Sequence, residues 1–291
     1  MQLPFCVMRV FLLQKSQGMR ITVLVENTGP EGFAIEHGLS LHVRMDDGHQ
    51  ILFDMGQSDA FVRNAARLDI DLQEVDYAVL SHGHYDHGGG LPYFLSLNAH
   101  APVYVHGEAF LPHYSLRENG LAFIGLDSAL EDHSQIHFCD GVFSLPSGGK
   151  IFSLGREKTD TPPGNRWLYG ADKQKHDTFC HEQNLLLEEG GHTVLFAGCA
   201  HKGIVSIMQE TTRLAGHSPT HVFAGMHLVK SGLSRQEEER YIHDLAQSLR
   251  AFPHCHYYTM HCTGVEQFEK LRTLMPGRIS YLGTGEAVEV D

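Results

Sequence analysis

The chain alternates short hydrophobic runs with segments of helical spacing, and turn residues separate them. Two of the runs flank Asp46-Asp47-Gly48-His49, which is typical of a hairpin turn. A second pair of runs is joined by Gly190-Gly191. From this pattern we predict a helix at 58–68 and strands at 20–26, 39–45, 50–53, 75–80, 103–105 and 184–189, and a further strand from 192 that carries Cys199 and His201 to its end.

Two regions depart from the alternation. Residues 110–178 are less periodic and rich in glycine, proline and aromatic residues, which predicts an inserted lid. Residues 1–18 include an apolar stretch that Arg9 interrupts and that no basic segment precedes, so it resembles neither a membrane span nor a secretion signal. We therefore expect one domain at 19–291, preceded by a leader or a non-native extension at 1–18.

The segment from Ser81 to His87 holds three imidazoles and a carboxylate directly after the buried strand at 75–80. In an extended chain alternate residues share a side, so His82, His84 and Asp86 converge. The glycines at 88–90 let the chain turn, so that His87 can reach the same centre. Because ligand sites of layered α/β folds lie at the carboxyl ends of strands, the cluster predicts a metal site.

Composition limits the partners. The chain has 291 residues, of which 42% are hydrophobic, so it can bury a full core. Its net charge of -13 argues against a nucleic-acid backbone as the main partner. The six cysteines show no CxxC spacing, and we expect them to be reduced in a cytoplasmic protein. We expect a small-molecule substrate and no membrane partner, and the oligomeric state stays open.

The run His82-Gly83-His84-Tyr85-Asp86-His87 resembles the HxHxDH signature of the metallo-β-lactamase superfamily. The resemblance implies an αββα sandwich, with two sheets covered by helices, and a centre of two divalent metal ions, with zinc favoured and manganese or iron as alternatives. In that superfamily an aspartate at the end of an earlier strand supports the metal loop, which points to Asp54. The alternative for Asp54 is a turn-capping role.

Further segments resemble a narrower group that includes the dihydropterin-linked synthase of methanopterin formation. These segments are Gly198-Cys199-Ala200-His201-Lys202-Gly203-Ile204, the GxHL segment with His227 and the HCTG segment with His261. Cys199 stands where much of the superfamily has a bridging aspartate. A thiolate can bind zinc, but a free cysteine is also a common buried residue. Both interpretations of Cys199 stay open.

The superfamily's usual GHT segment before the last hairpin is missing, so the third histidine of the first site must come from elsewhere. His192 follows a glycine but begins its strand at the turn, and we expect it at the surface. His201 is the preferred replacement and His181 the alternative, while Glu182 beside it is a candidate for a ligand or a substrate contact. The expected ligands are His82, His84 and His201 for one ion and Asp86, His87 and His261 for the other.

The implied chemistry is metal-assisted cleavage or condensation on a small anionic or heterocyclic substrate. Asp86 would orient water and carry a proton, and His227 either binds a substrate oxyanion or packs at a strand end. Simple hydrolysis of an ester, lactone or phosphodiester is the alternative, and a di-iron redox protein is a third. The lid places Trp167 among aromatic and basic residues, where it either binds a flat substrate or anchors the lid; the others are Tyr169, Phe179, Arg156, Arg166 and Lys173.

Overall fold

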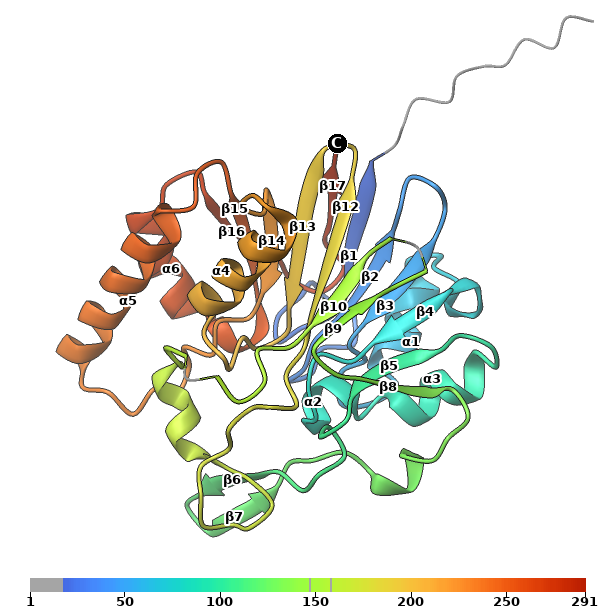
Figure 1. Cartoon of the computed structure of the whole chain (residues 1–291), viewed down its shortest axis with the longest axis horizontal. Helices are drawn as coiled ribbons and strands as arrows, with labels where there is room; N and C mark the ends of the chain where they lie inside the picture. The colour runs from blue at the N-terminus through green and yellow to red at the C-terminus, as the bar shows by residue number, and fades with distance from the viewer. Residues whose placement is uncertain (1–17, 147, 158) are drawn as a thin grey trace, which may run out of the picture.

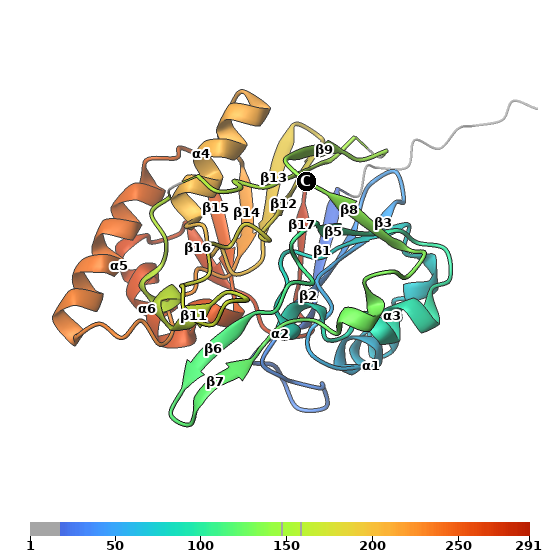
Figure 2. The same ribbon diagram turned by 60° about the horizontal axis from the view of Figure 1, so that its bottom comes forward.

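The protein is an αββα sandwich. Its computed structural model describes residues 18–146, 148–157 and 159–291. Two seven-stranded sheets pack face to face, and helices cover their outer faces (Figure 1, Figure 2). The predicted fold class is therefore confirmed. The hypothesis about residues 1–18 lies outside the described residues, apart from Gly18.

The first sheet mixes antiparallel and parallel strands. The predicted hairpin joins the antiparallel strands β2 and β3. The strands β3, β4, β5 and β8 run parallel to one another. In spatial order the sheet contains β17 (Ala287–Val290), β1 (Met19–Val25), β2 (Ser40–Arg44), β3 (Gln50–Phe53), β4 (Tyr77–Val79), β5 (Val103–His106) and β8 (Ile136–Cys139).

The second sheet repeats this arrangement. The glycine turn joins β12 and β13 as an antiparallel hairpin, and β13 to β16 are parallel. In spatial order the sheet contains β16 (Ile279–Tyr281), β15 (His256–Thr259), β14 (His221–Ala224), β13 (His192–Ala197), β12 (Asn184–Glu189), β10 (Lys150–Phe152) and β9 (Val142–Ser144).

Three layers of apolar side chains hold the sandwich together. The central layer, with Phe53 of the first sheet and Phe196 of the second, lies between the sheets. An outer layer packs α1 (Ala60–Arg67) and α3 (Leu91–Leu97) on the first sheet. The other outer layer packs α4 (Ile204–Ala215), α5 (Arg235–Arg250) and α6 (Val265–Leu274) on the second sheet. No helix of the described residues is long and apolar enough to cross a membrane.

The predicted lid is more regular than its sequence suggested. Its middle part supplies edge strands to both sheets, β8 to the first and β9 and β10 to the second. The remainder forms a small sheet of β11 (Leu168–Tyr169), β6 (Tyr114–Arg117) and β7 (Gly120–Phe123), next to the 3₁₀ turn η3 (Pro163–Trp167). Strands of two to four residues are too short to show an alternating pattern, which is why the sequence did not predict them. Further 3₁₀ turns are η1 (Leu72–Glu74), η2 (Ser128–Leu130) and η4 (His261–Thr263).

Candidate metal centre

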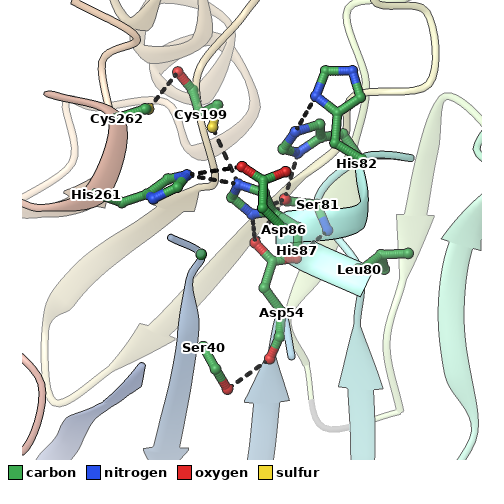
Figure 3. Close-up of polar contacts among 12 residues, drawn as sticks. Ser40, Asp54, Leu80, Ser81, His82, Asp86, His87, Cys199, His261 and Cys262 are labelled. Carbon is green, nitrogen blue, oxygen red and sulfur yellow. Dashed lines mark hydrogen bonds and ion pairs between the residues drawn. The ribbon is translucent and has the colours of Figure 1, made fainter. Parts of the chain in front are cut away.

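The candidate site lies at one edge of the sandwich, where parallel strands of both sheets end. Carboxyl ends of neighbouring parallel strands meet at the same edge, so residues far apart in sequence come together there. Polar residues lie within three positions of the ends of five of these strands: Asp54 after β3, Ser81 and His82 after β4, Cys199 after β13, His227 after β14 and His261 after β15. Both sheets therefore contribute to one centre (Figure 3).

The loop after β4 differs from the extended conformation that we expected. His84 is extended, but α2 (Tyr85–Gly88) is a single helical turn that carries Asp86 and His87. This turn packs tightly on the end of β3, because a Cβ atom at Gly90 would lie 2.1 Å from the carbonyl oxygen of Met55. Asp86 and His87 therefore reach the centre through a helical turn, which strand alternation could not predict.

The first group of ligand candidates, here called the His84 cluster, contains His82, His84 and His201. His82 Nε2 lies 3.1 Å from His84 Nδ1. The rings of His84 and His201 have centroids 5.1 Å apart. His201 Nε2 is buried and has no hydrogen-bond partner among the residues that the structure describes. The structure thus brings together the three histidines expected around one ion.

The second group, the His87 cluster, contains Asp86, His87 and His261. His87 Nε2 lies 3.2 Å from His261 Nε2, and His261 Nε2 lies 3.4 Å from Asp86 Oδ2 (Figure 3). Cys199 Sγ lies 3.1 Å from His87 Nε2. The sulfur is also within 4.8 Å of candidate ligand atoms of His82 and His201. Cys199 therefore lies between the two clusters.

Hydrogen bonds on the outer side of the rings fix their orientation around the His87 cluster. Asp54 Oδ2 accepts a hydrogen bond from His87 Nδ1 at 2.7 Å and one from Ser81 Oγ at 2.7 Å. Ser81 Oγ in turn lies 2.9 Å from His82 Nδ1. Because Nδ1 carries the hydrogen in each ring, the lone pair of Nε2 points inward, as metal ligation requires.

Two asparagines from distant segments hold the remaining histidines in the same way. Asn165 of η3 accepts from His201 Nδ1 at 2.9 Å and donates to the His201 carbonyl at 2.8 Å. Asn27, after β1, accepts from His261 Nδ1 at 2.8 Å and donates to the His261 carbonyl at 3.3 Å. Each side-chain amide therefore binds both the ring and the backbone of one histidine and turns its Nε2 inward.

The donor set fits divalent cations. Burial and the neighbouring histidines hold the pKa values of His82, His84 and His201 well below their ordinary range, so these rings are neutral. Burial alone would lower the pKa of His87, but Asp54 and Asp86 raise it to about 9. A proton on His87 Nε2 then occupies the position that a cation would take, and metal binding would displace it. Neutral imidazoles, a carboxylate and a thiol together suit zinc and related ions.

Glu182 supports the backbone around His201. Its two carboxylate oxygens accept from the backbone nitrogens of His201 at 2.6 Å and Lys202 at 2.8 Å. Burial raises the pKa of Glu182 to about 7. Metal ligation or a substrate contact by Glu182 stays a prediction.

His181, the alternative to His201 as the third histidine, and His192, which was expected at the surface, are placed differently. His181 accepts from the backbone nitrogen of Gly83 at 2.9 Å and lies 3.3 Å from Asp177 Oδ2, so both of its ring nitrogens already have partners. His192 is half-buried at the start of β13, and this strand carries its other end toward Cys199. In contrast to His181, His201 has an inward nitrogen without a hydrogen-bond partner among the described residues.

His227 and Trp167 lie on the lid side of the centre. The His227 ring packs against His201 with centroids 4.4 Å apart, and its buried Nδ1 has no partner among the described residues. Trp167 is 37% exposed and donates from its indole nitrogen to the Lys230 carbonyl at 2.9 Å. The aromatic ring that stacks on a candidate ligand is instead Phe179, 4.3 Å from the His201 ring. Substrate binding by Trp167 stays a prediction.

Sequence reasoning missed several residues of this site. His37 Nε2 lies 3.2 Å from Asp86 Oδ2, with a side chain that is 52% exposed at the mouth of the centre. Asn27 could have been found by a signal similar to the one that identified Asp54, because it is the second residue after the buried strand β1. His37 lies in an irregular segment and Asn165 in the short turn η3, where no pattern in the sequence marks them.

Comparisons with known proteins place the chain in a family. The family model described as the metallo-β-lactamase superfamily matches residues 37–208. An uncharacterised protein of Methanocaldococcus jannaschii is 28% identical over 261 residues, which are 87% of this chain and 94% of that protein. The 7,8-dihydropterin-6-methyl-4-(β-D-ribofuranosyl)-aminobenzene-5'-phosphate synthase of the same organism is 24% identical over 252 residues, covering 80% of this chain and 82% of the synthase.

Solved structures agree. Tm1679, described as a metal-dependent hydrolase of the β-lactamase superfamily, matches with a TM-score of 0.76 and 28% identity over 94% of this chain and 99% of its own. A diphosphatase of the PhnP family matches with a TM-score of 0.53 and 15% identity over 94% and 98%, which supports the fold alone. Since the family model spans more than half of the sequence and includes the HxHxDH loop, the chain belongs to the metallo-β-lactamase superfamily.

Proposed function

We propose that the protein is an enzyme that binds two divalent metal ions, with zinc favoured over manganese and iron, and acts on a small anionic or heterocyclic substrate. One observation carries the proposal: the His84 cluster and the His87 cluster adjoin at Cys199, and outer hydrogen bonds turn the Nε2 atoms of His82, His87, His201 and His261 inward. Such an arrangement has little structural use without a cation.

Two bound ions would supply a Lewis acid and a water of lowered pKa. Burial alone would raise the pKa of Asp86, but the contacts of its carboxylate with the His261 and His37 rings hold this pKa well below its usual value. Asp86 is therefore an ionised carboxylate that can orient a hydroxyl-bearing group, and proton transfer by Asp86 is part of the proposal. Half-exposed His37 connects Asp86 Oδ2 with the solvent at the mouth of the site.

His227 is the candidate for contact with a substrate oxygen. Burial, together with His261, lowers the pKa of His227 to about 4, so the ring is neutral and carries one N–H. Its buried Nδ1 lacks a partner among the described residues, and its ring lies directly beside His201. A neutral donor at this place would stabilise negative charge that develops on a substrate oxygen.

The substrate class rests on two lines of support. The similarity to a dihydropterin-linked synthase favours a ring-bearing, phosphorylated molecule, and aromatic and basic lid residues suit such a molecule. The similarity to Tm1679, described as a hydrolase, favours the second candidate, hydrolysis of an ester, lactone or phosphodiester. A di-iron redox protein is a third candidate. The optical spectrum of the purified protein separates it from a zinc enzyme, because a zinc protein is colourless.

Metal analysis of three variants tests the proposal. His84→Ala and Asp86→Ala should each lose at least one bound ion and turnover of model esters, lactones or phosphodiesters, while the core keeps the fold intact. His192→Ala is the matched control, since this histidine lies at the far end of β13. Wild-type metal content in both His84→Ala and Asp86→Ala would refute the proposed centre. Circular dichroism establishes that each variant is folded.

A further inference from the structure

His84 differs from the other ligand histidines in the direction of its ring. Its inward atom is Nδ1, 3.1 Å from His82 Nε2, so its outward atom is Nε2. That Nε2 is buried and has no hydrogen-bond partner among the residues that the structure describes. The other four ligand histidines each have an outer partner in Ser81, Asp54, Asn165 or Asn27. Among the five ligand histidines, all within the described residues, His84 is therefore the one whose outward nitrogen has no hydrogen-bond partner.

Three buried residues lie behind His84. Asp177 Oδ2 accepts from His113 Nδ1 at 2.8 Å and from His181 Nε2 at 3.3 Å. His181 Nδ1 accepts from the backbone nitrogen of Gly83, so His181 has no free nitrogen left. His113 Nε2, in contrast, is buried and lacks a partner among the described residues. The candidate ligand atoms of His84, His113, Asp177 and His181 lie within 4.8 Å of one another.

The hydrogens determine what the two open nitrogens can do. His113 donates from Nδ1 to Asp177, which leaves a lone pair on His113 Nε2. When His84 Nδ1 binds an ion, the remaining hydrogen of that ring is on Nε2. The rings of His84 and His113 meet edge to face with centroids 5.5 Å apart. A donor and an acceptor, both buried and both open, thus lie next to each other.

The same residues connect the two ends of the lid to the metal loop. His113 immediately precedes β6, whereas Asp177 and His181 lie between β11 and β12. Gly83 permits this close approach, because a Cβ atom there would lie 2.1 Å from the Ala109 carbonyl oxygen and 2.9 Å from His113 Nε2. The segments before β6 and after β11 are therefore in contact with the loop that carries His84.

We propose that His113 and Asp177 are positioning residues for His84. In the metal-bound protein His84 Nε2 donates to His113 Nε2, and His113 Nδ1 donates to Asp177, which fixes His84 with Nδ1 toward the ion. This rests on the proposed function, since it takes His84 to be a metal ligand. Outer partners of metal-bound histidines typically contribute about 10- to 100-fold to metal affinity.

Three variants and a control test this chain of hydrogen bonds. His113→Leu removes the acceptor beside His84, and Asp177→Asn removes the carboxylate that orients His113. His113→Gln restores an oxygen acceptor near the position of Nε2. The control is His42→Leu on β2, a buried histidine whose ring bonds Gln50 at 2.9 Å. Zinc affinity is measured by competition with a chromophoric chelator, and the geometry of the site by the visible spectrum of cobalt-substituted protein.

We expect His113→Leu and Asp177→Asn to lower zinc affinity about 10- to 100-fold and to change the cobalt spectrum. His113→Gln should recover most of the affinity, and His42→Leu should leave it unchanged. Equal affinities of His113→Leu and wild type would overturn the inference while leaving the proposed function intact. Loss of a third ion in His113→Leu would also overturn it, because these residues would then be ligands themselves. Wild-type protein that binds no zinc would instead refute the proposed function. Urea denaturation of the metal-free variants separates these results from a general loss of stability.

Discussion

Replacement of Asp54 by Asn should switch the hydrogen position on His87. Asp54 accepts three hydrogen bonds, from Ser81 N to Oδ1 and from Ser81 Oγ and His87 Nδ1 to Oδ2, each at 2.7 Å. An amide has one acceptor oxygen, and that oxygen must face the backbone N–H of Ser81, which cannot become an acceptor. The amide nitrogen then faces His87, whose Nδ1 must accept and whose hydrogen moves to Nε2, where the ion would bind. Asn tolerates the left-handed backbone of Asp54 (φ 59°), so the change tests the hydrogen bonds alone.

The size of the effect follows from the burial of this pair. The side chains of Asp54 and His87 are 0% exposed, and breaking a buried ion pair costs about 3–5 kcal/mol. Because Asn keeps one acceptor, we expect about 3 kcal/mol lower stability of the metal-free protein in urea denaturation at pH 7. We also expect about 10- to 100-fold weaker zinc binding at the His87 cluster.

Zinc titration against a chelator measures the affinities of the two clusters separately. Asp76→Asn is the control variant, since this exposed carboxylate accepts one backbone hydrogen bond from Gln50. Unchanged affinity at the His87 cluster in Asp54→Asn would show that Asp54 does not set the orientation of His87.

Three further predictions address other parts of the protein. If Cys199 binds metal as a thiolate, Cys199→Ser should weaken zinc binding strongly, whereas unchanged metal content with loss in His201→Ala would leave Cys199 as a packing residue. Trp167→Ala should raise KM with little change in metal content or Tm; a much lower Tm with normal substrate binding would make it a lid anchor. The metal-free protein should become less stable between pH 7 and pH 5.5, because six histidines in and around the centre have lowered pKa values and stay neutral while the unfolded chain binds protons below about pH 6.5. These histidines outnumber His87 and Glu182, whose raised pKa values affect stability in the opposite direction. Urea denaturation at both pH values measures the change in the free energy of unfolding. A constant or rising stability between pH 7 and pH 5.5 would contradict the prediction. The six are His82, His84, His181, His201, His227 and His261.

The sequence predicted those elements whose position depends on residues close by in the chain. The hairpin turns and the strand before the HxHxDH loop depend on neighbouring residues, and the structure contains all of them. The same holds for residues within two positions of the end of a parallel strand, such as Asp54 and Cys199. Their convergence follows from strand direction alone, without knowledge of the loops.

The supports of the centre could not be predicted, because tertiary packing brings them together. Asn27 and Asn165 are 138 positions apart in the sequence numbering, yet they bind His261 and His201 through the same pair of amide contacts. No spacing rule connects an asparagine to a histidine across 36 or 234 residues. His113 and Asp177 could not be predicted for the same reason, since only the folded chain brings these two residues together.

Ligands from both sheets have a consequence for the life of the protein in the cell. The loop after β4 belongs to one sheet and the segments after β13 and β15 to the other, so bound ions would cross-link the two halves of the sandwich. At a free metal concentration 100 times Kd, such binding adds about 2.7 kcal/mol to the free energy of unfolding for each ion. Metal starvation would then loosen both halves at once and expose the chain to proteases, so the abundance of the protein would follow the supply of its metal.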